Sequence, residues 1–280
     1  MLSNAKDMLD LLRNNIGEAV PSLWENINLM RNLNQAYMEL YRKVSMASGQ
    51  WLIKSTSLSF SGSKADLPSD CLKPVYIEDA NGRPITWLSS VGQRRVSRGY
   101  GEDSGLLGVR EAYLTRKELV VNESNFSGQV TLWYQQKPVY LIAGTAEDSD
   151  VGSLTLEDGL RHESVDDAYE GQVIELVSGS HPGLYDITGY DAATRTLTLD
   201  TTDNPGLADY GLVPVTPEIC NDFIVLRATV LAMSKPSANV DDKVYSMFIK
   251  DYGTVRREVE QWLATRAIEN IGVSIGEVTL

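Results

Sequence analysis

The chain has 280 residues and a formal net charge of −13 at pH 7, with 42% hydrophobic and 22% charged residues. No run approaches the ~18 apolar residues that a membrane span needs, and the first twenty residues lack the charged-then-apolar pattern of a signal peptide. The two cysteines are too few for a disulfide framework. We therefore expect a globular protein without membrane contact, built as one large domain or two smaller ones.

The charge imbalance lies entirely in residues 143–212. This segment has fifteen Asp and Glu residues against two basic ones, Arg161 and Arg195, which gives it a net charge of −13. The other 210 residues hold twenty-three acidic and twenty-three basic side chains, so together they are neutral. A charged block in a neutral chain predicts a module with its own surface and its own task.

The first part of the chain has the pattern of two helices. Ser3 can cap a short helix that Gly17 ends. After Pro21, apolar residues recur at steps of three and four from Leu23 to Val44, which predicts a longer amphipathic helix.

Strand patterns follow. Residues 51–60 are rich in strand formers, and the Asn-Gly pair at 81–82 predicts a hairpin, because both residue types tolerate a positive φ. Residues 89–110 read as a long loop with five glycines and four arginines. Residues 112–121 and 129–134 then predict a second strand pair.

The acidic segment also predicts strands. Residues 153–157, 171–177 and 194–200 alternate apolar and polar side chains, and each run is bounded by Gly, Asp or Pro. Asp191 is placed to initiate the turn of a hairpin. These patterns predict a small antiparallel sheet or barrel.

Helix returns after Pro217, a favourable first helical position, and Pro236 closes it. A last long helix begins at Asp241 and Asp242, whose charges suit the helix dipole. Its predicted buried stripe contains, in chain order, Val244, Met247 or Phe248, Val255, Val259 and Trp262.

Residues 271–280 alternate apolar and small side chains and carry no helix cap. This pattern predicts a strand that adds to the sheet of another subunit or protein. A frayed terminus is the alternative.

Helices at both ends of the chain with strands between them predict an α+β fold. The N-terminal helices should pack with the two C-terminal helices beside an antiparallel sheet. We expect residues 1–142 and 213–280 to form one discontinuous domain, and residues 143–212 to form an inserted small all-β domain.

The sequence offers no catalytic, cofactor-binding or metal-ligating motif. It has no Gly-Lys-Ser/Thr phosphate loop, no complete dinucleotide loop and no Gly-x-Ser-x-Gly elbow. His162 and His181 cannot form a zinc site with the distant Cys71 and Cys220. We interpret both cysteines as buried or idle thiols in a reducing cytoplasm, with one disulfide as the alternative.

Two chemical alternatives stay open for the acidic segment. A carboxylate pair in a cleft could cleave glycans. Calcium could bind oxygen ligands on turns, although the spacing of a helix–loop–helix calcium site is missing. The candidate ligands are Asp148, Asp150, Asp200 and Asp203.

Arg94, Arg95 and Arg98, with Lys117 nearby, form the one basic cluster of the sequence. The cluster predicts an intersubunit or phosphate contact on the long loop. The alternative is a solvated loop whose positive charge offsets the acidic residues that follow it.

Two groups of motifs resemble known phage proteins. The Asn34-Gln-Ala-Tyr-Met-Glu-Leu-Tyr41 helix, the strand at Trp51 and the Leu67-Pro-Ser-Asp70 stop resemble, in their order, the head-to-tail adaptor (connector) proteins of tailed bacteriophages. This resemblance covers most of residues 20–142 and 213–265. The acidic segment resembles a small β module that recurs in phage virion proteins, through its Asp-Asp-Ala-Tyr-Glu-Gly and Tyr-Asp-Ala-Ala-Thr motifs.

The resemblance implies a structural, non-enzymatic protein of the virion neck, assembled in the host cytoplasm. Such proteins form a twelvefold ring under the portal protein, bind it partly through their C-terminal segments, and contact the tail or the next neck component. Genome DNA passes through the channel without sequence recognition. In this chain the implied portal-binding residues are Ile271, Val273, Ile275, Val278 and Leu280.

The acidic segment leaves the orientation of such a ring open. We expect it to face outward, because an inserted domain of about seventy residues is most easily accommodated at the periphery of a ring. Facing the channel, it would repel the DNA backbone instead. The alternative to a neck protein is a tail or fibre component whose β domain binds carbohydrate or calcium.

Overall fold

The chain divides into two compact units in this computed structural model. One unit contains Met1–Trp51 and Pro138–Leu280, and the other contains Leu52–Lys137. Side chains are described as far as Thr265. The described residues are 3–18, 24–47, 52–88, 111–115, 117–122, 126–158, 162–234 and 241–275.

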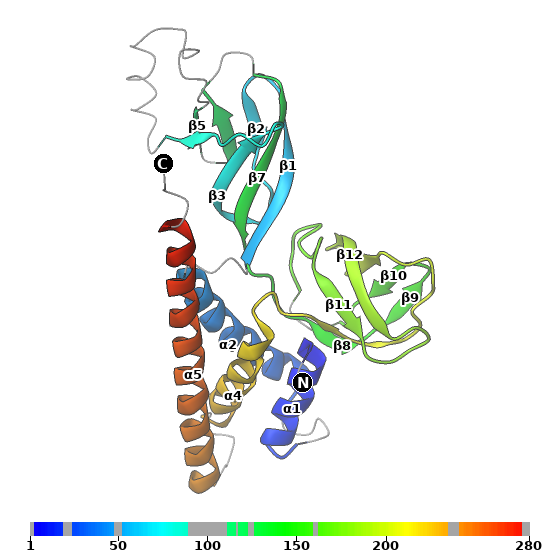
Figure 1. Ribbon diagram of the computed structural model, residues 1–280. Coiled ribbons are helices and arrows are strands. Elements are labelled where there is room, and N and C mark those ends of the chain that lie inside the picture. The colour runs from blue at the N-terminus through cyan, green and yellow to red at the C-terminus, as the bar shows by residue number, and fades with distance from the viewer. Residues whose placement is uncertain are drawn as a thin grey trace. The chain divides into compact units, whose positions relative to one another are not determined.

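The first unit contains four α-helices among its described residues (Figure 1). They are α1 (Ala5–Asn15), α2 (Asn26–Met46), α4 (Asn221–Met233) and α5 (Asp242–Ile275), and a short 3-10 helix, η3 (Glu218–Cys220), precedes α4. Helices α1, α2 and α5 all contact α4. The prediction that helices from the two ends of the chain pack together is therefore confirmed.

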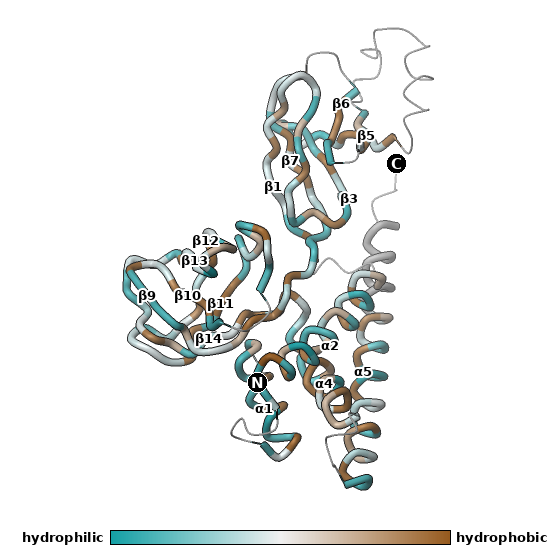
Figure 2. The backbone as a smooth tube through the Cα atoms, turned by 180° about the vertical axis from the view of Figure 1, so that it is seen from behind, coloured by the Kyte–Doolittle hydropathy of each residue, from teal (hydrophilic) through white to brown (hydrophobic). Residues whose placement is uncertain are grey.

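Helix α4 is apolar on almost every side because it lies among three other helices. Figure 2 shows this hydrophobic character along its length. Its buried apolar residues include Phe223, Ile224, Val225, Ala228, Val230, Ala232 and Met233.

The acidic segment folds into seven antiparallel strands. Their spatial order is β8, β14, β11, β12, β13, β10, β9. In chain order they are β8 (Ala143–Thr145), β9 (Asp148–Asp150), β10 (Ser153–Thr155), β11 (Val173–Leu176), β12 (Gly183–Asp191), β13 (Thr196–Leu199) and β14 (Asp209–Leu212).

The two end strands of this sheet are joined by only two residues, and the sheet closes into a barrel. Ala146 N donates to Ala208 O, beside β14, at 2.9 Å, and Glu147 N donates to Thr155 O of β10 at 3.0 Å. One continuous stretch, residues 143–150, thus bonds β14 with its first half and β10 with its second. Of the two predicted forms, a small antiparallel sheet or a barrel, the structure shows the barrel (Figure 1).

The second unit contains two sheets that share one core. The first has the order β1 (Ile53–Phe60), β7 (Gly128–Gln136), β3 (Cys71–Asp79). The second has the order β2 (Lys64–Asp66), β6 (Glu118–Val121), β5 (Glu111–Thr115), β4 (Thr86–Trp87).

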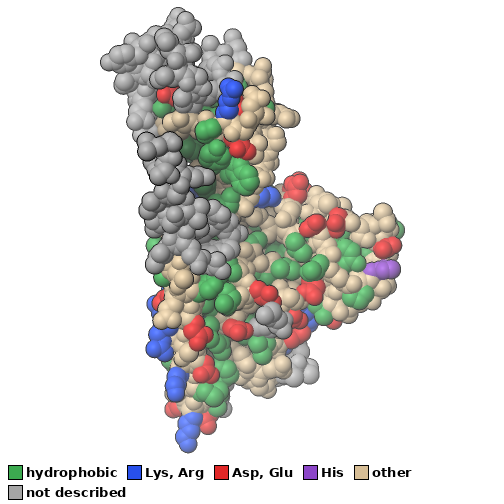
Figure 3. Space-filling view, viewed as in Figure 1, with side chains coloured by type: hydrophobic (Ala, Val, Ile, Leu, Met, Phe, Trp, Pro, Cys, Tyr) green, Lys and Arg blue, Asp and Glu red, His purple; other side chains and the backbone are tan. Residues whose placement is uncertain are grey.

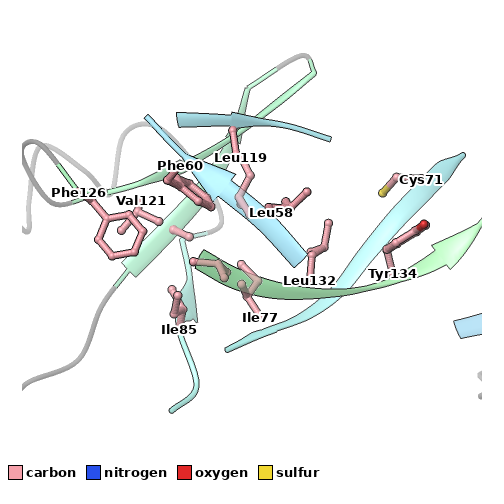
Figure 4. Close-up of a cluster of buried hydrophobic side chains, with 13 residues drawn as sticks. Leu58, Phe60, Cys71, Ile77, Ile85, Leu119, Val121, Phe126, Leu132 and Tyr134 are labelled. Atoms are coloured by element: carbon pink, nitrogen blue, oxygen red, sulfur yellow. The ribbon is translucent and has the colours of Figure 1, made fainter. Parts of the chain in front are cut away.

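Side chains from both sheets meet in this core (Figure 4). Leu58, Ile77 and Leu132 come from the first sheet and Leu119 from the second. The hairpin predicted at residues 81–82 is confirmed, since Ile85 N donates to Ile77 O and Gly82 has a φ of 73°.

Three predicted elements differ in the structure. Residues 112–121 are not one strand of a pair with 129–134: β5 and β6 pair with each other, and β7 pairs with β1 and β3. Lys117, between β5 and β6, lies in a turn that the apolar pattern does not reveal. The N-cap of α1 is Asn4 rather than Ser3, because Asn4 accepts the hydrogen bonds of the first turn.

The predicted strand at 271–280 is also wrong for residues 271–275, where α5 continues to Ile275. No proline or glycine occurs between Ala264 and Ile271. The single Gly272 costs only about 1 kcal/mol relative to alanine, which does not end a helix by itself.

The division into units differs from the predicted domains as well. The prediction joined residues 52–137 to the helices and set residues 143–212 apart, whereas the structure separates Leu52–Lys137 as one compact unit. These strands have their own core, which periodicity alone does not reveal. A separate domain at residues 143–212 stays a prediction.

Candidate functional site

Asn34 joins α2 to the chain segment that leads into the barrel. Its side chain is buried, with 6% exposed. Its Nδ2 donates to Leu141 O at 2.9 Å and to Met30 O at 3.1 Å, and its Oδ1 accepts from Leu141 N at 2.7 Å. The amide side chain therefore pairs with both backbone groups of Leu141, as a neighbouring strand would.

Tyr37, less than one helical turn further along α2, holds the segment that leaves the barrel. Burial raises the pKa of Tyr37 well above its usual value, nearby Tyr41 raises it further, and a backbone hydrogen bond with Val215 partly offsets both effects. The rings of Tyr37 and Tyr41 pack edge to face, with their centroids 6.3 Å apart. The Asn-x-Ala-Tyr motif thus fixes the incoming and outgoing segments of the barrel on one helix.

The N-terminus of α1 contacts the barrel directly. Asn4 Oδ1 accepts from Lys6 N at 2.8 Å and Asp7 N at 2.9 Å, while its Nδ2 donates to Glu175 Oε2 of β11 at 2.7 Å. Ser3 Oγ donates to the same carboxylate oxygen at 2.7 Å. One asparagine therefore caps a helix and attaches that helix to the barrel.

Gly211 of β14 makes this close approach possible. A Cβ at this position would lie 2.5 Å from both Asn4 Oδ1 and Lys6 N, which no side chain tolerates. The barrel is therefore not a free appendage, because the start of α1 rests on its β14 backbone.

Many carboxylates of the barrel stabilise its own turns. Asp191 Oδ1 accepts from Ala193 N at 2.8 Å and Thr194 N at 3.1 Å, which confirms the predicted turn. These hydrogen bonds lower the pKa of Asp191. Other carboxylates that accept a backbone N–H within the barrel are those of Glu147, Asp148, Asp150, Glu157, Asp166, Asp167 and Asp200.

The acidic residues of the barrel outnumber its bases at the surface. Arg195 forms ion pairs with Asp158 at 2.9 Å and Glu147 at 3.2 Å, and it is the one lysine or arginine among the described residues of the segment. Most of the negative charge therefore faces solvent or a partner.

The carboxylates do not gather into a metal site within the described residues. No group of three or more His, Cys, Asp or Glu side chains there could hold a metal ion. The carboxylates of Asp148, Asp150 and Asp200 accept hydrogen bonds from backbone N–H groups. Asp203 Oδ2 lies 4.0 Å from His181 Nδ1.

Both cysteines are buried free thiols, as the first interpretation expected, and they do not form the alternative disulfide. Burial raises the pKa of Cys71 to about 11, with nearby Asp70 adding to the effect and Lys137 opposing it. Burial also raises the pKa of Cys220 to about 11. Neither thiol is therefore a reactive thiolate at neutral pH.

The predicted contact residues are only partly described. Arg94, Arg95 and Arg98 lie outside the described residues, as do Val278 and Leu280. Ile271, Val273 and Ile275 lie in the last two turns of α5, and nothing more is described of them than their helical backbone. Their roles stay predictions.

Several apolar side chains are exposed on the barrel and on α5. On the barrel, Leu184 and Leu207 are each 64% exposed, and Val177 is also exposed. On α5, Val244 was predicted to be buried but is exposed beside Met247, which is 50% exposed. The buried residues among the described side chains of α5 are the predicted Phe248 and Val259, together with Leu263.

Residues 3–186 match the family described as SU10 adaptor protein. This stretch begins before α1, contains the whole second unit and ends inside β12. The chain belongs to the SU10 adaptor protein family. No match to a curated protein was found.

Membership in this adaptor family supports a non-enzymatic structural protein of a phage virion that contacts other head or tail proteins. Helices α4 and α5 lie beyond the matched residues. Among the described residues, no helix is long and apolar enough to cross a membrane.

Proposed function

We propose that this adaptor forms a ring in the phage neck, which joins the portal protein to the tail or to the next neck component. The match of residues 3–186 to the SU10 adaptor protein family carries the proposal. The motif order that resembles head-to-tail adaptors supports it, because Asn34 and Tyr37 of that motif hold the barrel segments on α2.

The ring would leave a channel for genome DNA, and twelve copies is the number that the resemblance implies. The barrels lie at its periphery, where an inserted module of about seventy residues meets least obstruction. Arg94, Arg95 and Arg98 contact a neighbouring subunit or the phosphates of the DNA. The C-terminal residues from Ile271 to Leu280 bind the portal.

Electron microscopy of the chain mixed with its portal protein tests the ring. We expect closed rings attached to one end of the portal. Trimers without portal association would contradict the proposal and favour a fibre component instead.

Removing the C-terminal segment tests the portal contact. Deletion of residues 271–280 should abolish co-purification with the portal, because the apolar Ile271, Val273 and Ile275 are lost. The helical content measured by circular dichroism should fall only slightly, since α5 still packs on α4 through Phe248 and residues before the deletion. Deletion of residues 276–280 alone is the matched variant, which retains those three side chains. Portal binding by the longer deletion at wild-type strength would contradict the assignment.

A further inference from the structure

One side of the barrel presents aliphatic side chains among carboxylates. Leu184 of β12 pairs with Glu175 of β11, so both side chains point to the outer face. Val177 follows two residues after Glu175 on that face, and its N–H donates to Asp209 O at 2.8 Å. The exposed Leu207 lies just before Asp209. We call Val177, Leu184, Asp186, Leu207 and Asp209 the barrel patch.

The exposed side of α5 carries two lysines next to apolar side chains, with the exposed Asp251 one turn beyond Met247. Lys243, Met247 and Lys250 follow one another at steps of four and three, so they form one stripe, and Val244 lies beside it. All four side chains are exposed. We call these four residues the α5 patch. In Figure 3 basic side chains line the edge of α5, and hydrophobic side chains lie between acidic ones over the barrel.

The two patches match in chemistry. Each has an apolar centre, and two carboxylates of the barrel patch, those of Asp186 and Asp209, can pair with Lys243 and Lys250 of the α5 patch. Within one protomer α5 packs on α4, whereas the barrel contacts α1, so these internal contacts leave both patches exposed. A contact between two different surfaces of identical chains is head-to-tail, which is the kind that closes a ring.

We propose that the barrel patch of one copy docks on the α5 patch of the next copy. This proposal rests on the proposed ring and names the surfaces that build it. Burial of the apolar centres would hold the copies together, and the opposite charges would set the register and the direction of assembly.

Cysteine cross-linking tests the contact directly, because the native Cys71 and Cys220 are buried. The variant L184C/M247C, assembled on portal and then oxidised, should give a ladder of covalent dimers, trimers and higher multimers on a non-reducing gel. Each single variant, L184C or M247C, should stay monomeric on the same gel. Rings seen by microscopy without a ladder would overturn this contact and leave the neck function standing.

Two further outcomes also count against the contact. A covalent dimer from L184C alone would show that barrels face each other. A failure of every variant and of the wild-type chain to form rings on the portal would overturn the proposed function, and this contact with it.

A charge exchange provides a second, independent test. Asp186 is exposed next to Leu184 on the same face of β12. The variants D186K and K250D should each lower the yield of rings at least tenfold, and the double variant should restore it. The control E170K changes the net charge of the barrel equally at another exposed position and should leave the yield unchanged. Equal losses in all three single variants would contradict a specific contact.

Discussion

Asn34 pairs with a backbone that lies 107 positions away in the sequence. The sequence shows the Asn-x-Ala-Tyr pattern but not its partner, because Leu141 has no feature that marks it as the acceptor of an amide. The pattern could therefore support a resemblance without explaining it. The structure supplies the physical reason: a buried amide that satisfies the N–H and C=O of one residue in an irregular segment.

Replacement of Asn34 by leucine should lower the free energy of unfolding by roughly 2–4 kcal/mol, because the N–H and C=O of Leu141 would stay buried without partners. Asn32→Leu is the matched control, since Asn32 is also buried on α2 but its Nδ2 has no hydrogen-bond partner. We expect that control to be near neutral or stabilising. Urea unfolding of both variants measures the free energy of unfolding. Equal losses of stability in the two variants would show that the hydrogen bonds to Leu141 are not what makes Asn34 stabilising.

At the scale of elements, local signals predicted more than long-range ones. The helices followed from periodicity, and the turns at residues 81–82 and 191–194 followed from Asn-Gly and Asp chemistry. The central position of β7 did not, because its partners β1 and β3 lie far away in the sequence. The exposure of Val244 was also missed, since helical spacing does not show on which side a neighbouring helix packs.

Two glycines predict opposite effects of the same substitution. Gly211→Ala should destabilise the unit that contains the barrel, because its Cβ would collide with backbone and side-chain atoms of Asn4 and Lys6 at the start of α1. Gly253→Ala should stabilise α5 by about 0.5–1 kcal/mol, because no atom lies near its Cβ and alanine favours a helix. Thermal melts of the two variants provide the comparison. A stable Gly211→Ala variant would show that α1 does not rest on the barrel.

Each of the two units contains buried apolar side chains of its own among the described residues. The sheets of residues 52–137 enclose one core, whereas the helices and the barrel form the other unit. The candidate contact surfaces were not predictable at this scale, because they depend on which sides of α5 and the barrel remain uncovered. Composition did indicate one of them, since it located the whole charge imbalance in the segment that became the barrel.

Calorimetry should resolve two unfolding transitions, because each unit has its own core. Ile77→Ala removes most of a fully buried side chain from the second unit. It should lower the free energy of unfolding of that unit by about 2–5 kcal/mol and shift only the corresponding transition to lower temperature. Gly211→Ala should shift only the transition of the unit that contains the barrel to lower temperature. A single transition that both variants lower equally would show that the chain unfolds as one cooperative block.

The two-residue junction between β8 and β9 has a consequence for crowding. An open sheet presents unpaired N–H and C=O groups that invite strands from adjacent molecules. Here one continuous stretch, residues 143–150, bonds β14 with its first half and β10 with its second, so the sheet does not end in two separate, fully open edge strands. Crowded copies therefore offer one another shorter runs of unpaired backbone groups than an open sheet would, which favours association through side chains.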